Sequence, residues 1–326
     1  MNNIFALGVD SPHTFLFGVG EYHITKPLLL KFGFNNRCEV AGFDSDHSCI
    51  LQTSNNTPIL IAHDYVCIHD LKLKYSCVQI YVETENKENS ITEGIAIAAQ
   101  RLLMAEIYNL TVHNAAVVLG GLDATLDFTD TAFVNINVRN IRAIGVSGYF
   151  YCGKTPTGEF FENSGSTFDN IRMTITPDGV NYRGSCLGFS TFSSNTNMAR
   201  IGELNIEEGD IQKDVFGLSG LCSLSIDYLH FEDVKFNSYI LFARDGTSLK
   251  VGTLDFDFQI VFRCYIAILA LTGRSFIDIG CIQFLDGDAA PFIESGIEES
   301  EVYLYTPENG NDGVCWGQSF FPVHAV

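Results

Sequence analysis

Basic residues are scarce in this chain of 326 residues. Lys and Arg number 19 against 39 Asp and Glu, which gives a formal net charge of −20 at pH 7. Nucleic acids and anionic membranes are attracted by a basic field, and this composition does not supply one. The charge balance therefore argues against nucleic acid and anionic lipid as partners.

Long hydrophobic runs are also lacking. No segment reaches the ~18 apolar residues that span a bilayer, and the apolar stretch from Phe258 to Leu271 is interrupted by Gln259 and Arg263. The first residues, Met1 to Leu7, include no basic residue, unlike a secretory signal. We expect no membrane insertion and no cleaved leader, and we expect the chain to fold in a cytoplasm.

The ten Cys residues include no CxxC pair and no closely spaced Cys/His set of the kind that indicates zinc. We therefore predict free thiols that serve as small core hydrophobes, with no cofactor and no metal centre. Hydrophobic residues make up 46% of the chain, which is ample for a core.

The most informative feature that is present is an internal repeat. Its motif is apolar-x-x-Leu/Ile-x-apolar, as in Ile68-His69-Asp70-Leu71-Lys72-Leu73. The central residues are Leu71, Leu110, Ile141, Ile171, Leu204, Leu229, Leu254 and Ile282, at intervals of 39, 31, 30, 33, 25, 25 and 28 positions. A variable interval of this size is typical of a coil whose turns carry loops of differing length.

Each copy of the motif continues with alternating polar and apolar residues, the pattern of a strand with one buried face. We therefore predict an all-β fold, a single-stranded parallel β-helix, in which each turn is buried against its neighbours. The predicted divisions are an N-terminal cap with the first coil at 1–36, the parallel β-helix at 37–290, and a C-terminal cap or oligomer contact at 291–326. The segment from Ile91 to Met104 is predicted to be a helix or a long loop inserted between two coils.

The start of the chain resembles the first coil of the pectate-lyase-like superfamily. The residues that carry the resemblance are Gly20-Glu21-Tyr22-His23-Ile24, followed by Pro27-Leu28-Leu29-Leu30 and Val40-Ala41-Gly42. In style the chain is similar to phage tailspike proteins of that superfamily. The resemblance implies a right-handed coil, and a homotrimer if the member is a viral spike.

The repeat alignment places one polar residue after each central Leu or Ile, pointing outward. This first outward column is Lys72, Thr111, Arg142, Arg172, Asn205, His230, Asp255 and Gln283. A second outward column, two residues further on, contains Thr174, Glu207, Glu232 and Asp257. Its three carboxylates should be stacked at ~4.8 Å, beside His230 and Asp255.

Three interpretations of these acids stay open. Paired carboxylates suit glycosidic hydrolysis, with Glu232 as general acid, Asp257 or Glu207 as nucleophile or base, and assistance from His230 and Asp255. Oxygen ligands could also hold a divalent cation. The third interpretation is a solvated acidic face with no ligand. Like charges at this spacing would also favour a retained proton at a raised pKa.

Other polar and aromatic groups are candidates for substrate binding. Arg142 and Arg172 could hold a sugar carboxylate through forked hydrogen bonds, or pair with nearby acids such as Asp169. Tyr149 and Tyr151 flank a Gly-rich stretch and could stack on sugars, dock a second subunit or be buried against the shaft.

These observations lead to a functional expectation. We predict a phage tailspike or tail-fibre component of the virion tail, assembled in the host cytoplasm, that binds a host cell-surface polysaccharide. Its partners would be the host surface glycan, other virion tail proteins and further copies of itself in a homotrimer. One alternative is an active polysaccharide depolymerase, either a glycoside hydrolase or a lyase. The other is a purely structural virion protein.

Overall fold

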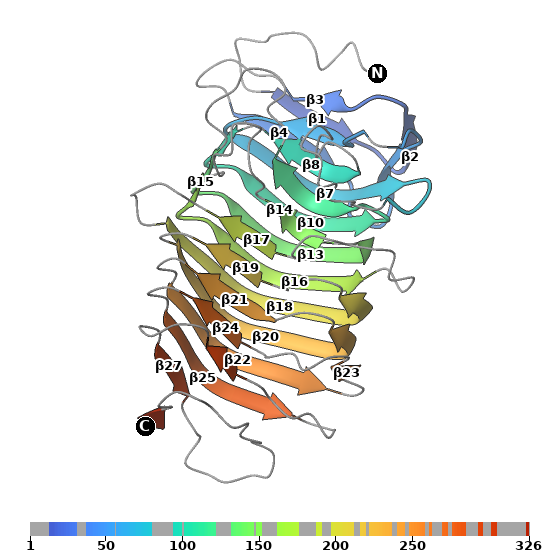
Figure 1. Ribbon diagram of the computed structural model, residues 1–326. Coiled ribbons are helices and arrows are strands. Elements are labelled where there is room, and N and C mark those ends of the chain that lie inside the picture. Colours follow the sequence, from blue (N-terminus) through green and yellow to red (C-terminus); the bar gives the residue numbers. More distant parts are fainter. Residues whose placement is uncertain are drawn as a thin grey trace, which may run out of the picture.

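The computed structural model describes residues 13–30, 37–55, 57–79, 94–99, 101–121, 132–146, 148–151, 162–175, 187–190, 197–211, 216–219, 222–236, 240–244, 248–257, 261–262, 269–272, 276–284, 293–295, 301–304 and 324–325. All regular elements within these ranges are β-strands. Every strand pairing given for them is parallel, and the partner strands come from successive turns of one chain. The predicted single-stranded parallel β-helix is therefore confirmed (Figure 1).

The first sheet forms one long side of the stack. Its main path runs β1-β4-β7-β10-β13-β16-β18-β20-β22-β25-β27-β28, and β2, β5 and β23 pair beside it. The strands are β1 (His13–Phe17), β2 (Gly20–Ile24), β4 (Cys38–Gly42), β5 (Ser48–Gln52), β7 (Val66–Tyr75), β10 (Glu106–His113), β13 (Asn137–Val146), β16 (Thr167–Ile175), β18 (Asn197–Ile211), β20 (Cys222–Phe236), β22 (Ser248–Asp257), β23 (Val261–Phe262), β25 (Phe276–Phe284), β27 (Glu301–Leu304) and β28 (His324–Ala325).

Two further parallel sheets complete the turns. The second has the order β26-β24-β21-β19-β17-β14-β11-β8-β6-β3, and the third has the order β15-β12-β9. Their strands are β3 (Leu28–Leu29), β6 (Leu60–Ala62), β8 (Ile95–Ala99), β9 (Arg101–Leu103), β11 (Val117–Gly121), β12 (Ala132–Val134), β14 (Gly148–Tyr151), β15 (Glu162–Ser164), β17 (Leu187–Ser190), β19 (Phe216–Ser219), β21 (Leu241–Arg244), β24 (Leu269–Thr272) and β26 (Ile293–Ser295).

The core runs along the inside of the stack. The eight central Leu and Ile residues of the repeat are aligned in one column of the first sheet, from Leu71 on β7 to Ile282 on β25. Apolar residues on both sides of this column are also buried, and the Phe231 and Phe256 rings stack with centroids 5.5 Å apart. The apolar face of each strand is therefore buried by the strands of the turns before and after it, as expected for a solenoid.

A ladder of amide and carboxylate side chains crosses the first sheet at one position of each turn. Asp70, Asn109, Asn140 and Asn170 each precede a central Leu or Ile, and all have φ between 50° and 54°. After glycine, Asn and Asp tolerate this left-handed conformation best. Each Asn donates from Nδ2 to the side-chain oxygen of the residue one turn before it, over 2.8–3.0 Å.

The prediction of a helix or long loop over Ile91 to Met104 is wrong for its described part. Residues 95–99 and 101–103 form β8 and β9, and all five residues of β8 are buried. A strand buried on both faces is a continuous run of apolar residues, which periodicity alone does not distinguish from a buried helix. Residues 91–93 lie outside the described ranges.

The ends of the chain contribute strands to the same stack. β1, β2 and β3 pair directly with the next turn, and β26 and β27 extend the second and first sheets. Most of the predicted C-terminal cap, including residues 305–323, lies outside the described residues. In the part of the chain that is described, no helix has the length and apolar character needed to cross a membrane.

Candidate functional site

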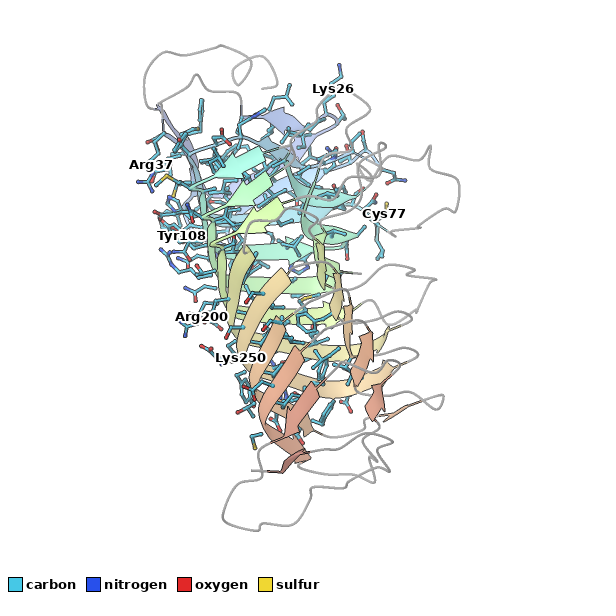
Figure 2. The ribbon with its side chains drawn as sticks, turned by 60° about the vertical axis from the view of Figure 1, so that its left-hand side comes forward. Lys26, Arg37, Cys77, Tyr108, Arg200 and Lys250 are labelled. Carbon is cyan, nitrogen blue, oxygen red and sulfur yellow. The ribbon has the colours of Figure 1, made fainter. Side chains whose placement is uncertain are left out.

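The outer face of the first sheet has the alignment that the repeat predicts. All eight residues of the first outward column are paired in one register, from Lys72 on β7 to Gln283 on β25. In the second column Thr174, Glu207, Glu232 and Asp257 are paired on consecutive strands. Figure 2 shows side chains along the outer side of this sheet, among them Tyr108, Arg200 and Lys250.

Asp255 is the centre of the candidate site. Its Oδ2 accepts a hydrogen bond of 2.7 Å from the Tyr228 hydroxyl and lies 2.9 Å from Nδ1 of His230. Although Asp255 is in an outward column, it is only 3% exposed, because the two neighbouring rings cover it. Its Oδ1 is buried and has no hydrogen-bond partner among the described residues. A buried carboxylate oxygen without a donor costs free energy, and burial also closes Oδ1 to any ligand on the outer face.

Tyr228 belongs to the site although the two outward columns do not contain it. Tyr228 directly precedes the central Leu229, which is the position that Asp70 and the three Asn of the ladder occupy in earlier turns. Its strand neighbours at that position are Glu203 and Thr253. Its ring is nearly parallel to that of His230, with centroids 6.2 Å apart. Burial and the hydrogen bond to Asp255 raise the pKa of Tyr228, so its hydroxyl stays a donor at neutral pH. The sequence signal for Tyr228 was its place directly before the central Leu229.

His230 connects this buried pair to the second column. Its Nδ1 faces Asp255, and its Nε2 lies 3.8 Å from Oε2 of Glu232. The arrangement in which Nδ1–H donates to Asp255 leaves Nε2 as an acceptor on the side of Glu232. The two atoms are 3.8 Å apart, so one hydroxyl of a bound molecule would lie within reach of both groups.

At least one of the three stacked carboxylates, Glu207, has a positively charged partner. Arg172 Nε lies 2.7 Å from Oε1 of Glu207, and this contact raises the pKa of the arginine. Of the two uses considered for Arg172, the structure shows pairing with an acid, although the acid is Glu207 rather than Asp169. Arg142 is exposed one turn before Arg172 in the same column.

The two candidate tyrosines are on a different sheet from these residues. Tyr149 and Tyr151 are both in β14, in the second sheet, whereas the acids and arginines are all in the first. Tyr151 pairs with Gly120 and Gly188 of the neighbouring turns. The structure therefore does not bring these tyrosines into the outward columns of the first sheet.

The architecture defines the chain as a single-stranded parallel β-helix protein. No protein-family model matches the chain, and no curated protein matches it. Among solved structures, it is similar to the gp42 tailspike of Acinetobacter phage vb_AbaP_AS12, with 10% identity and a TM-score of 0.49 over 93% of this chain. It is also similar to full-length tailspike protein 2 of the Escherichia coli O157:H7 bacteriophage CAB120, with 8% identity and a TM-score of 0.42 over 89% of this chain. The matches cover 61% and 38% of those two proteins.

Proposed function

We propose that this chain is a phage tail component, of the tailspike or tail-fibre kind, that binds a host cell-surface polysaccharide. The outer face of the first sheet is the proposed binding surface. The observation that carries the proposal is the cluster of Tyr228, His230 and Asp255, in which the buried carboxylate orients the imidazole beside Glu232 on the outer face. Sugar hydroxyls are both donors and acceptors, so they suit a face that offers carboxylates, an imidazole and a phenol.

A repeating ligand also suits a repeating surface. Polar groups recur on this face once per turn, at the ~4.8 Å spacing of parallel strands. A polysaccharide presents hydroxyls periodically, so an extended chain lying along the stack would meet similar groups at successive turns. Arg142, exposed on the same face, would then meet a carboxylate of an acidic sugar.

The cysteines support assembly in a reducing cytoplasm. Cys38, Cys49 and Cys67 are buried free thiols in the described part of the chain, and Cys38 packs in the hydrophobic core. Free thiols are usual in proteins that fold in a cytoplasm, and secreted proteins tend to form disulfides. Incorporation into the virion tail, contact with other tail proteins and assembly as a homotrimer are part of this proposal.

A second candidate function is depolymerisation of the bound polysaccharide. It is favoured by the position of Glu232, which has Glu207 and Asp257 on the adjacent strands and His230 Nε2 at 3.8 Å. In this version Glu232 is the general acid and Asp257 or Glu207 is the nucleophile or base, the pairing that glycoside hydrolysis needs. His230, oriented by Asp255, would exchange protons with Glu232.

Binding and cleavage can be separated in one experiment. A panel of purified bacterial capsular and O-antigen polysaccharides, including that of the host, is titrated against the protein by calorimetry. The same mixtures are then analysed for chain length by size-exclusion chromatography. We expect saturable binding, weakened at least ~10-fold by Glu232→Gln, since a loss of about 1.4 kcal/mol has that effect. Shortened chains would establish the depolymerase.

Asp227→Asn is the matched control. Asp227 is on the same strand as Glu232, is exposed and pairs with Arg200. Asp227 lies outside both outward columns and its carboxylate already pairs with Arg200, so its substitution should weaken polysaccharide binding less than Glu232→Gln does. Equal affinities for wild type and Glu232→Gln would refute the second column as part of the binding surface. No binding to the host polysaccharide would refute the proposed function itself.

A further inference from the structure

A second cluster of chemically reactive side chains lies near the other end of the first sheet. Cys67 and His69 are two residues apart on β7, so both side chains point to the outer face. Glu39, on β4 of the previous turn, is paired with Cys67. Four strands of the first sheet separate β7 from β20, so this cluster is distinct from the site around Asp255.

The three side chains converge on one point. One ligand atom from each of Glu39, Cys67 and His69 can be chosen so that all lie within 4.8 Å of one another. Nε2 of His69 is 2.9 Å from Oε1 of Glu39. Ala41 is paired with His69 on the side of Glu39, and its small side chain leaves room for the ring to approach the carboxylate.

We propose that Glu39, Cys67 and His69 bind a transition-metal dication of the Zn²⁺ type. The donor set is one sulfur, one imidazole nitrogen and one carboxylate oxygen. Thiolate and imidazole favour zinc over calcium or magnesium, which prefer oxygen ligands. Three protein ligands leave a fourth tetrahedral position for water or for a ligand atom from outside the chain.

Two neighbouring side chains, Asp70 and Thr14, orient the proposed ligands His69 and Glu39 through hydrogen bonds. Oδ2 of Asp70 is 2.7 Å from Nδ1 of His69, which directs Nε2 toward the cluster. Such a carboxylate–histidine pair is the usual support of a zinc-bound imidazole. Thr14 donates to Oε2 of Glu39 over 2.8 Å, which leaves Oε1 on the side of His69. The other oxygen of Asp70 accepts from Asn109.

The imidazole ring is also fixed by stacking. His69 lies flat against the ring of Tyr108, with centroids 4.7 Å apart and an interplanar angle of 4°. The guanidinium of Arg139 is 4.4 Å from the centre of that same tyrosine ring. A site whose ligands are already oriented loses less conformational entropy on binding.

A nucleophilic cysteine is the competing interpretation of the same residues, and the geometry disfavours it. Activation requires the His69 nitrogen to face the thiol, but Nε2 is within hydrogen-bond distance of Glu39 and Nδ1 of Asp70. A metal ion would use all three side chains at once and would connect the turn of β4 to the turn of β7.

Cobalt is a suitable probe, because its bond to a thiolate gives a charge-transfer absorption band. The chain of 326 residues is freed of metal with a chelator, titrated with Co²⁺, and then titrated with Zn²⁺. We expect one Co²⁺ per chain, a thiolate band, and loss of that band as Zn²⁺ displaces cobalt. Cys67→Ser should abolish the band, and Asp70→Asn should weaken metal affinity about 10–100-fold as an orienting residue.

Glu39→Gln and Cys49→Ser complete the set of variants. Glu39→Gln keeps the shape of a half-exposed side chain, so it should fold normally, but it should weaken Zn²⁺ binding at least ~10-fold. Cys49→Ser removes another buried thiol, outside the cluster, and should leave the band unchanged. Absence of the band in wild type, or its persistence in Cys67→Ser, would overturn the proposal. Neither result depends on polysaccharide binding.

Discussion

Nδ1 of His230 lies 2.9 Å from Oδ2 of Asp255 in the next turn of the stack. The two residues are 25 positions apart in the chain and adjacent in the first outward column. The Asp255 carboxylate is buried and holds Nδ1 of the imidazole. The other ring nitrogen, Nε2, therefore faces Glu232. A buried acid thus determines how an exposed face presents its hydrogen-bonding groups.

Tyr228→Phe should lower stability by about 1.5–3 kcal/mol, the usual contribution of a hydrogen bond to a charged group. The substitution removes a donor from Oδ2 of the buried Asp255 and leaves the apolar part of the ring in place. Unfolding by urea, followed by circular dichroism, measures the change. Tyr22→Phe is the comparison, since its hydroxyl bonds an exposed backbone carbonyl at 3.2 Å and should cost less. Equal losses in the two variants would contradict the role given to Asp255.

Asn140→Ala should destabilise the protein by about 2–4 kcal/mol. Two side-chain hydrogen bonds of the ladder are lost, with Asn109 and with Asn170, and alanine is strained at a φ of 54°. Asn140→Gly relieves the strain but restores no hydrogen bond, so it should recover part of the loss. The midpoints of chemical unfolding give the comparison. If glycine were no better than alanine, the backbone conformation would contribute nothing measurable.

Gly42→Ala should be strongly destabilising, by about 3 kcal/mol or more. A Cβ at this position would lie 2.0 Å from the backbone oxygen of Asp70 and 2.7 Å from Cβ of Ser48. The turn of β4 and the turn of β7 would have to move apart. Gly18→Ala is the matched control, because its Cβ would meet only the Tyr22 hydroxyl, at 3.5 Å. A normal melting temperature for Gly42→Ala would show that the two turns are not held this closely.

His113 should make the fold less stable in mild acid. Burial and the positive charges of Lys72, Lys74 and Arg142 lower its pKa below 6.5, and these effects outweigh the opposite effect of Asp46. As the pH falls through about 6.5, the unfolded chain takes up a proton that the folded chain does not, so stability is lost below that value and is full above it. His113→Gln should flatten the fall in melting temperature between about pH 7.5 and 5.5.

The contribution of His113 is read as the difference between the two pH profiles. His69 has a raised pKa because its hydrogen bonds to Asp70 and Glu39 outweigh the effect of burial, so it acts in the opposite direction in both proteins. Subtraction of the His113→Gln profile removes this common part. Parallel profiles for wild type and variant would refute the prediction.

Much of the candidate site was predictable because its geometry follows from strand periodicity. Alternation along a strand determines which residues point outward, and the apolar repeat determines which turns are aligned. Periodicity alone therefore placed Glu207, Glu232 and Asp257 in one column and His230 beside Asp255, and the strand pairings confirm both placements. Tyr228 was missed because it occupies the position where the first four copies of the repeat have Asp or Asn, which the repeat motif left undefined.

The class of fold, the alignment of the turns and the polar character of the outer face all follow from the amino-acid sequence, since they depend on a pattern of burial that each turn repeats. The contacts between particular polar groups follow only from the folded chain. The side chains of Arg172 and Glu207, or of Glu39 and His69, are about one turn of the coil apart in sequence, and their contacts depend on rotamers and on how rings cover carboxylates. The periodicity of a strand specifies the face of a residue, but packing against the next turn specifies its partner.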